Sequence, residues 1–203
     1  MKPILFNTEM VRAILNGEKT QTRRIMKPQP MFYNGRKYIF KDSDCPKKWE
    51  QCDNIIDTYR YQKGDILYVR ETWSEGWEEG TYIYKADDKL ADNPLFEYST
   101  KLIYKPSIHM PKEAARIFLS VTDIRIEKLQ DIDCSGALAE GCDGRCDCPS
   151  SGTEGSLSCI TMDFSIERFQ AVWDKTIKKS ELGIYGWNAN PWVWVIEFER
   201  VKE

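Results

Sequence analysis

The apolar side chains of residues 8–15 fall on one stripe of a predicted helix. Asn7 or Thr8 can cap this helix at its N-terminus, and Gly17 accepts the positive φ of a C′ position. The stripe consists of Met10, Val11, Ile14 and Leu15. The residues after Gly17 therefore begin a new segment just past a rigid element.

Two further helices are predicted in the C-terminal half of the chain. Asp131 or Asp133 can cap a short helix that Gly141 ends. Ser165 can cap a longer one, because the apolar residues after it recur at helical spacing: Ile166, Phe169, Val172 and Trp173.

Runs of β-branched and aromatic residues predict the strands. Residues 66–73, 81–86 and 117–129 are such runs, and residues 190–199 are apolar enough for a central strand. Asn34-Gly35 predicts a hairpin turn. Helices and strands do not alternate regularly as in a doubly wound sheet. We therefore expect an α+β fold, a small curled or closed β-barrel with flanking helices.

Polar stretches interrupt this pattern at about residues 28–62, 87–104 and 142–160. We interpret them as inserts in a single domain that spans residues 1–203, a length that fits one well-buried domain. Residues 105–111 contain two prolines in six residues and predict an extended segment rather than a helix. No run approaches the ~20 apolar residues that a membrane span requires.

Composition narrows the function classes. The formal charge of −3 argues against a protein that coats nucleic acid nonspecifically, because such binding neutralises many phosphates. The seven cysteines are an odd number, and no export signal precedes the strand-like Ile4-Leu5-Phe6. We therefore expect a reducing, cytoplasmic compartment in which the cysteines are free thiols or metal ligands.

Candidate chemistry concentrates in residues 17–24, Gly-Glu-Lys-Thr-Gln-Thr-Arg-Arg. If this segment is extended, Thr22 points away from Lys19 and Arg23, whereas a turn or bulge allows Lys19 and Thr22 to converge. The sequence leaves both arrangements open. The guanidinium groups of Arg23 and Arg24 suit a phosphate or a base edge, and a structural ion pair is an equal alternative for Arg24.

This segment resembles the signature of the ASCH family, a branch of the PUA-like β-barrel superfamily. Gly17, Lys19 and Arg24 stand at the family's spacing. Two later elements also resemble the family. One is the strand that begins at Gly64-Asp65. The other is the element Leu129-Gln130-Asp131-Ile132, which leads to the helix Ala137-Leu138-Ala139-Glu140-Gly141. The match reaches from residue 2 to residue 201, and the long form with inserts resembles prophage-encoded ASCH proteins. The resemblance implies a PUA-like fold.

Thr22 stands where the family usually has glutamate. A threonine here, with lysine three residues before it, resembles the small bacterial ASCH amidohydrolases that remove the acetyl group from N4-acetylcytidine. The resemblance implies that Lys19, Thr22 and Glu140 act together as catalytic residues. It implies no cofactor and no metal in the reaction.

The chemistry of these three groups fits that role. A threonine hydroxyl needs a base within ~2.6–3.2 Å, and a lysine can serve if burial lowers its pKa toward neutrality. A carboxylic acid can protonate the departing exocyclic nitrogen, and Glu140 is the candidate. The alternative is that Lys19 is a solvated charge, Thr22 an ordinary strand residue and Glu140 an ordinary residue of the last helical turn.

Arg70 and Glu71 are further candidates for substrate binding. They lie near the end of the strand predicted at residues 66–73, from which they can reach the same site or simply pair with each other.

The cysteine-rich insert offers a weak zinc candidate formed by Cys142, Cys146, Cys148 and Cys159. Cys142 and Cys146 have the spacing of a zinc knuckle, but Cys146 and Cys148 are too close for a regular one. Free thiols are the favoured interpretation, as for Cys45 and Cys52. The single histidine, His109, excludes a Ser-His-Asp triad within one chain and suits a packing role.

Three functions follow from these expectations. The leading one is an amidohydrolase that acts on N4-acylated cytosine, as a nucleoside or base. The chief alternative is a non-catalytic RNA-binding PUA-like module, with Trp187 as a candidate stacking residue. A ribonuclease is the third. In each case the partner is a modified cytidine or RNA and not a membrane.

Overall fold

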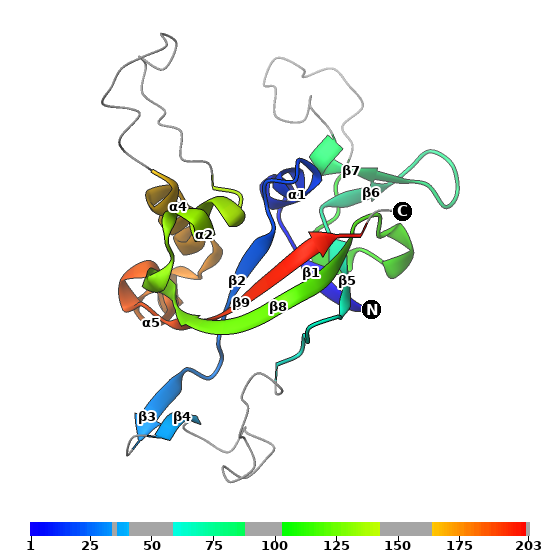
Figure 1. Cartoon of the computed structure of the whole chain (residues 1–203). Helices are drawn as coiled ribbons and strands as arrows, with labels where there is room; N and C mark the ends of the chain where they lie inside the picture. The colour runs from blue at the N-terminus through cyan, green and yellow to red at the C-terminus, as the bar shows by residue number, and fades with distance from the viewer. Residues whose placement is uncertain (34–35, 41–58, 88–102, 143–163, 202–203) are drawn as a thin grey trace, which may run out of the picture. The chain divides into compact units, whose positions relative to one another are not determined.

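The computed structural model describes residues 1–33, 36–40, 59–87, 103–142 and 164–201, and in residues 31–33 and 36–40 it describes only the backbone. These residues form helices and a mixed five-stranded sheet, so the α+β class is confirmed (Figure 1). The strand order is β1 (Lys2–Leu5), β5 (Ile66–Arg70), β8 (Phe118–Lys128), β9 (Trp192–Arg200) and β2 (Gln21–Ile25). Among the described strands β1 and β2 end this order, and the expected closed barrel is not found. No helix in the described ranges has the length and apolar character to cross a membrane.

Contacts divide the chain into two compact units. The first unit consists of Met1–Thr20, Lys63–Thr122 and Phe198–Glu203, and the second unit of Gln21–Gln62 and Asp123–Glu197. The long strands β8 (Phe118–Lys128) and β9 (Trp192–Arg200) contribute residues to both.

In the first unit, β1 pairs with β5 in parallel, and β5 pairs with β8 in antiparallel orientation. A separate hairpin joins β6 and β7. The elements are β1 (Lys2–Leu5), α1 (Thr8–Leu15), β5 (Ile66–Arg70), β6 (Trp73–Glu75), β7 (Tyr82–Tyr84) and the 3-10 turns η3 (Lys85–Asp87), η4 (Ser107–His109) and η5 (Lys112–Ala114).

The ends of α1 are as the sequence predicts. Asn7 is the N-cap, and its Oδ1 accepts a hydrogen bond of 2.8 Å from the backbone N–H of Met10. Gly17 has a φ of +78° at the C′ position, where a Cβ would be strained. The segment that follows therefore leaves the helix at a defined residue.

The predicted strand 66–73 is two strands, because the chain breaks at Glu71. The backbone N–H of Glu71 faces the Sδ of Met110 at 3.1 Å instead of a strand partner. Pro106 and Pro111 each precede a 3-10 turn, so the expected extended segment 105–111 is only partly extended. Proline fits there because the residue before such a turn needs no N–H donor.

The second unit contains the antiparallel pair β2 and β9, and the hairpin β3–β4 that Asn34-Gly35 predicts. Its elements are β2 (Gln21–Ile25), β3 (Pro30–Tyr33), β4 (Arg36–Phe40), η6 (Leu129–Asp131), α2 (Cys134–Ala139), α4 (Ser165–Thr176), η7 (Lys179–Glu181), α5 (Leu182–Tyr185) and η8 (Trp187–Ala189).

Two of the three predicted helix ends in this unit are correct. Asp133 caps α2 by accepting a 2.7 Å hydrogen bond from the N–H of Gly136, and Gly141 has a φ of +84°. Asp131 instead accepts from the N–H of Lys128 at η6. Ser165 is wrong as an N-cap, because Phe164 holds that position and Ser165 is already helical and fully buried.

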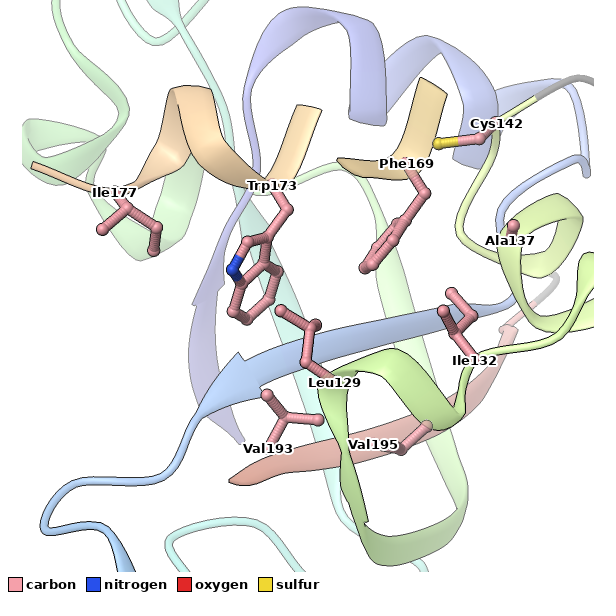
Figure 2. Close-up of a cluster of buried hydrophobic side chains, with 9 residues drawn as sticks. All are labelled: Leu129, Ile132, Ala137, Cys142, Phe169, Trp173, Ile177, Val193 and Val195. Carbon is pink, nitrogen blue, oxygen red and sulfur yellow. The ribbon is translucent and has the colours of Figure 1, made fainter. Parts of the chain in front are cut away.

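The core of the second unit lies between α4, α2 and β9 (Figure 2). Phe169 and Trp173 project from α4 toward this core, which confirms the predicted stripe. Trp187 packs against the same cluster, half-buried, with its ring centroid 6.2 Å from that of Phe169. It is therefore less exposed than expected, and the most exposed tryptophan among the described residues is Trp77.

Candidate functional site

The extended backbone of β2 decides which of its side chains share a face. Gln21 and Arg23 point to one face, and Thr22 and Arg24 point to the other, since strand side chains alternate. Across the pair, Glu197 of β9 lies opposite Gln21. The sequence left two arrangements open, an extended segment and a turn or bulge. The structure has the extended one from Gln21 onward.

Arg23 joins four elements of the second unit. Its Nη2 lies 3.0 Å from Oε2 of Glu127 on β8, and its Nη1 lies 3.3 Å from Oε1 of Glu140, the C-cap residue of α2. Its guanidinium carbon is 5.7 Å from the ring centroid of Phe169 on α4. Gly136 of α2 leaves room for it, because a Cβ there would lie 3.3 Å from Nη2.

Arg125 continues this arrangement along the sheet. It donates to Glu127 and to Glu197, and its Nη2 donates to Oε1 of Gln21 at 3.1 Å. We call these residues the Arg23 cluster: Gln21, Arg23, Arg125, Glu127, Glu140 and Glu197. Two arginines and three glutamates give the cluster a formal charge of −1, so it is not a site built for a phosphate.

Two donors of the Arg23 cluster lack a hydrogen-bond partner in the part of the chain that the structure describes. They are Nε of Arg23 and Nε2 of Gln21, each on a residue that is 4% exposed. Most buried polar atoms in folded proteins are paired, directly or through water. The cluster is therefore strongly desolvated but incompletely satisfied.

The opposite face of the β2–β9 pair is aromatic. The ring of Tyr59 stacks on Trp194 with a centroid distance of 4.3 Å and an interplanar angle of 16°. Arg60 lies over the ring of Tyr61 at 4.8 Å. Burial raises the pKa of the Tyr59 hydroxyl and that of Tyr61, although Arg24 opposes both shifts. We call Tyr59, Tyr61, Trp194, Arg24 and Arg60 the aromatic face.

Lys19 belongs to the first unit, where it is 2% exposed. Its Nζ lies 5.8 Å from the ring centroid of Phe6, and its backbone N–H donates to the carbonyl of Ala13. The alternative that Lys19 is a solvated charge is therefore wrong. Thr22 is a strand residue and Glu140 a helix C-cap, as that alternative held, but both are buried.

Arg70 and Glu71, also in the first unit, do not pair with each other. Glu71 is 1% exposed and binds Arg116 through both carboxylate oxygens, at 2.9 and 3.0 Å. Arg70 donates to the carbonyl of Ile108. Burial raises the pKa of Glu71, although the hydrogen bonds from Arg116 oppose that shift. We call Glu71, Asp87, Arg116 and Tyr84 the Arg116 cluster, since Arg116 also pairs with Asp87 and lies over the ring of Tyr84.

Of the predicted site residues, the structure brings together Arg23 and Glu140 and places Thr22 and Arg24 on the other face of β2. Four residues of the Arg23 cluster were not predicted from the sequence as site residues: Gln21, Arg125, Glu127 and Glu197. The sequence of β8 does contain a signal for this cluster. Leu119 and Val121, which are buried, begin one face of the strand, and the later residues on that face are charged. A run of charges at every second position predicts a polar cluster on that face.

The zinc candidate lies mostly outside the described residues. Cys146, Cys148 and Cys159 fall there, as do Cys45 and Cys52, whereas Cys142 is buried in the core of the second unit. Within the described ranges no three His, Cys, Asp or Glu side chains form a group that could hold a metal. His109 is exposed on η4, so its expected packing role is wrong.

Comparisons of the chain with protein-family models, with curated proteins and with solved structures found no match. The resemblance to the ASCH family therefore depends on the motif residues themselves.

Proposed function

We propose that this protein is an amidohydrolase of the ASCH type, with a PUA-like fold, that removes the acyl group from N4-acylated cytosine as a base or nucleoside. One observation carries the proposal: the three residues that the resemblance names as catalytic are all buried polar residues. Lys19 and Thr22 are each 2% exposed, and Glu140 is 8% exposed. Burial of charged and polar side chains costs free energy, and side chains buried at such a cost often belong to functional sites.

The reaction is the hydrolysis of an amide. An oxygen nucleophile adds to the acyl carbon, the bond from that carbon to N4 breaks, N4 takes a proton, and water finally releases the acyl group as a carboxylate. In this proposal Thr22 supplies the nucleophilic oxygen, with Lys19 as the base that the resemblance implies. Glu140 handles the proton that N4 receives.

The direct test is incubation of the purified protein with N4-acetylcytidine, with cytidine measured by chromatography. Thr22→Ala should lower kcat by orders of magnitude while substrate affinity stays within about tenfold, because the hydroxyl acts mainly in the transition state. Thr20→Ala is the matched control, since Thr20 is exposed and two residues away. A flat trace with wild-type protein would reject the function, and an active Thr22→Ala would indicate water as the nucleophile.

The aromatic face supports a second candidate, a module that binds single-stranded RNA. Tyr59 is only half-buried above Trp194, and Arg60 is exposed beside it, so a base could stack there while an arginine contacts a phosphate. With a formal charge of −3, we expect such binding to be local and to neutralise only one or two phosphates. No observation of this kind favours a ribonuclease.

Titration of a single-stranded RNA oligomer tests this candidate. If the aromatic face binds RNA, Tyr59→Ala should weaken binding by roughly 1–3 kcal/mol, and log affinity should fall by about 0.7 per phosphate contact for each tenfold rise in salt. A much steeper salt dependence would contradict a local site. Unchanged affinity in Tyr59→Ala would exclude the aromatic face.

A further inference from the structure

The turn between β6 and β7 presents a tryptophan to solvent (Figure 1). Trp77 is 79% exposed, and the neighbouring Glu75, Glu78 and Glu79 are exposed as well. We propose that this turn is a docking site for a partner protein that presents arginine, whose guanidinium group stacks on Trp77 and pairs with Glu78 and Glu79. None of these residues belongs to the proposed active site, so the docking site does not depend on the proposed function.

Backbone hydrogen bonds hold the turn in one shape. The N–H of Gly76 donates to the carbonyl of Thr81 at 2.8 Å, and the N–H and hydroxyl of Thr81 both donate to the carbonyl of Glu78, at 3.1 and 2.7 Å. Gly76 has no room for a side chain, since a Cβ there would lie 2.1 Å from Oγ1 of Thr81. Gly80 has a φ of +79°, which favours glycine. The turn is therefore preorganised, and a partner that binds it has little backbone to order.

The indole ring of Trp77 and the carboxylates of Glu78 and Glu79 are open to a partner. Within the described ranges, no side chain stacks on this ring or forms an ion pair with these two carboxylates. Exposure alone does not identify a site, because single apolar residues are common on protein surfaces. The combination of groups is the specific feature, since tryptophan is the side chain whose ring binds cations best and is enriched where proteins bind each other.

The charge of the turn selects the class of partner. Residues 75–81 contain three glutamates and no lysine or arginine, which gives them a formal charge of −3. Lys105 pairs with Glu75 at 2.6 Å, so the turn together with this lysine carries −2. Such a surface repels the phosphates of nucleic acid and the headgroups of anionic lipids. It attracts a cationic partner, and the indole ring favours a cation that can stack.

The Arg116 cluster shows this kind of recognition within the chain itself. The guanidinium carbon of Arg116 lies 3.9 Å from the ring centroid of Tyr84 on β7, and its nitrogens pair with the carboxylates of Glu71 and Asp87. One aromatic ring and two carboxylates thus hold an arginine. The turn offers the same groups, and the partner supplies the arginine. Arginine suits them better than lysine, because a planar guanidinium can stack on a ring and bind a carboxylate through two nitrogens.

Isothermal titration calorimetry of the full chain with a peptide of alternating arginine and glycine tests the proposal. A peptide with lysine in place of arginine is the second probe, and it should bind more weakly at equal charge. Trp77→Ala should weaken binding of the arginine peptide about tenfold, because it removes the central residue of the interface. Trp77→Phe should weaken it less, since phenylalanine keeps a ring.

A pair of charge variants tests the carboxylates. Glu78→Gln combined with Glu79→Gln should weaken binding of the arginine peptide and flatten its salt dependence, since these groups supply the attraction. The matched control is Glu9→Gln combined with Glu167→Gln, which removes the same charge from exposed positions on α1 and α4. This control should leave the affinity within about twofold, because exposed charges away from the contact are screened by salt.

Four outcomes would overturn the proposal. They are failure of the arginine peptide to bind wild type, equal binding of this peptide to wild type and Trp77→Ala, equal binding of the arginine and lysine peptides, and binding of a single-stranded RNA oligomer that depends on Trp77. Sedimentation velocity completes the test. If wild type associates with itself and Trp77→Ala does not, the occupant is a second copy of this chain, and the proposed partner is wrong.

Discussion

The two arginine clusters, one in each unit, use similar residues and differ in how completely they are paired. Arg116 binds both oxygens of Glu71 at 2.9 and 3.0 Å and also pairs with Asp87. Arg23 makes one contact of 3.0 Å and one of 3.3 Å, and its Nε has no partner in the described residues. Yet the Arg23 side chain is 2% exposed, whereas that of Arg116 is 26% exposed.

This difference separates structure from candidate function. A buried carboxylate that an arginine binds through both oxygens has its hydrogen-bonding groups paired. Removal of the arginine should therefore lower the stability of the fold. A fully buried arginine with an unpaired donor is costly to keep, and such local inconsistencies tend to occur at functional sites. The Arg116 cluster is therefore structural in our interpretation, and the Arg23 cluster belongs to the proposed site.

The largest expected difference between the clusters is in activity. Glu140→Gln should lower kcat for N4-acetylcytidine by about 10²–10⁴-fold, because it removes general acid–base catalysis. Asp87→Asn, the matched change in the Arg116 cluster, should leave kcat within about twofold. Steady-state kinetics on both variants checks this, and equal losses would remove the distinction drawn here.

Stability should show the reverse order. Arg116→Met leaves the buried Glu71 unpaired and should lower the free energy of unfolding by about 3–5 kcal/mol. Arg23→Met should cost less, by about 1–3 kcal/mol, because Arg23 makes only one contact with each of Glu127 and Glu140, and because the change also removes a buried donor without a partner in the described residues. Urea denaturation at pH 7 measures both, and a larger loss in Arg23→Met would reverse the assignment.

The pH dependence of stability should have opposite signs at two carboxylates. The pKa of Glu71 is raised from 4.5, so its contribution is present below that pH and is lost as pH rises through the raised value. The pKa of Asp133 is lowered from 3.8, so its contribution is present above that pH and is lost as pH falls through the lowered value. Unfolding of Glu71→Gln and Asp133→Asn at a series of pH values from acid to neutral, compared with wild type, should show each slope disappear separately.

The smallest effects should be alike in the two units. Gly17→Ala and Gly141→Ala each place a Cβ at a φ of +78° or +84° and should each cost about 1 kcal/mol. Thermal unfolding measures both, with Gly183→Ala as a control that meets no atom within 4 Å and has no positive φ. Equal losses would show that helix ends do not distinguish the units, and only the arginine clusters do.

The helix ends and strands could largely be predicted from the sequence. The caps Asn7 and Asp133 and the glycines at residues 17 and 141 depend on a few neighbouring residues, and so does the alternation of β8. The prediction that Ser165 caps α4 was wrong for a related reason. A serine before an apolar stripe predicts a cap, but the chain turns helical one residue earlier and buries the serine.

For the candidate site, the sequence by itself supplied a recognisable spacing of Lys19, Thr22 and Arg24, and it named Arg23 and Glu140 as further candidates. Only the tertiary structure decided which partners their side chains have. Arg23 meets Glu140 across 117 residues of sequence, and Glu71 takes a partner 45 residues away instead of its neighbour Arg70. Local spacing determines backbone conformation because caps and alternation act within a few residues, whereas charges are paired and buried by packing between elements that are distant in the chain.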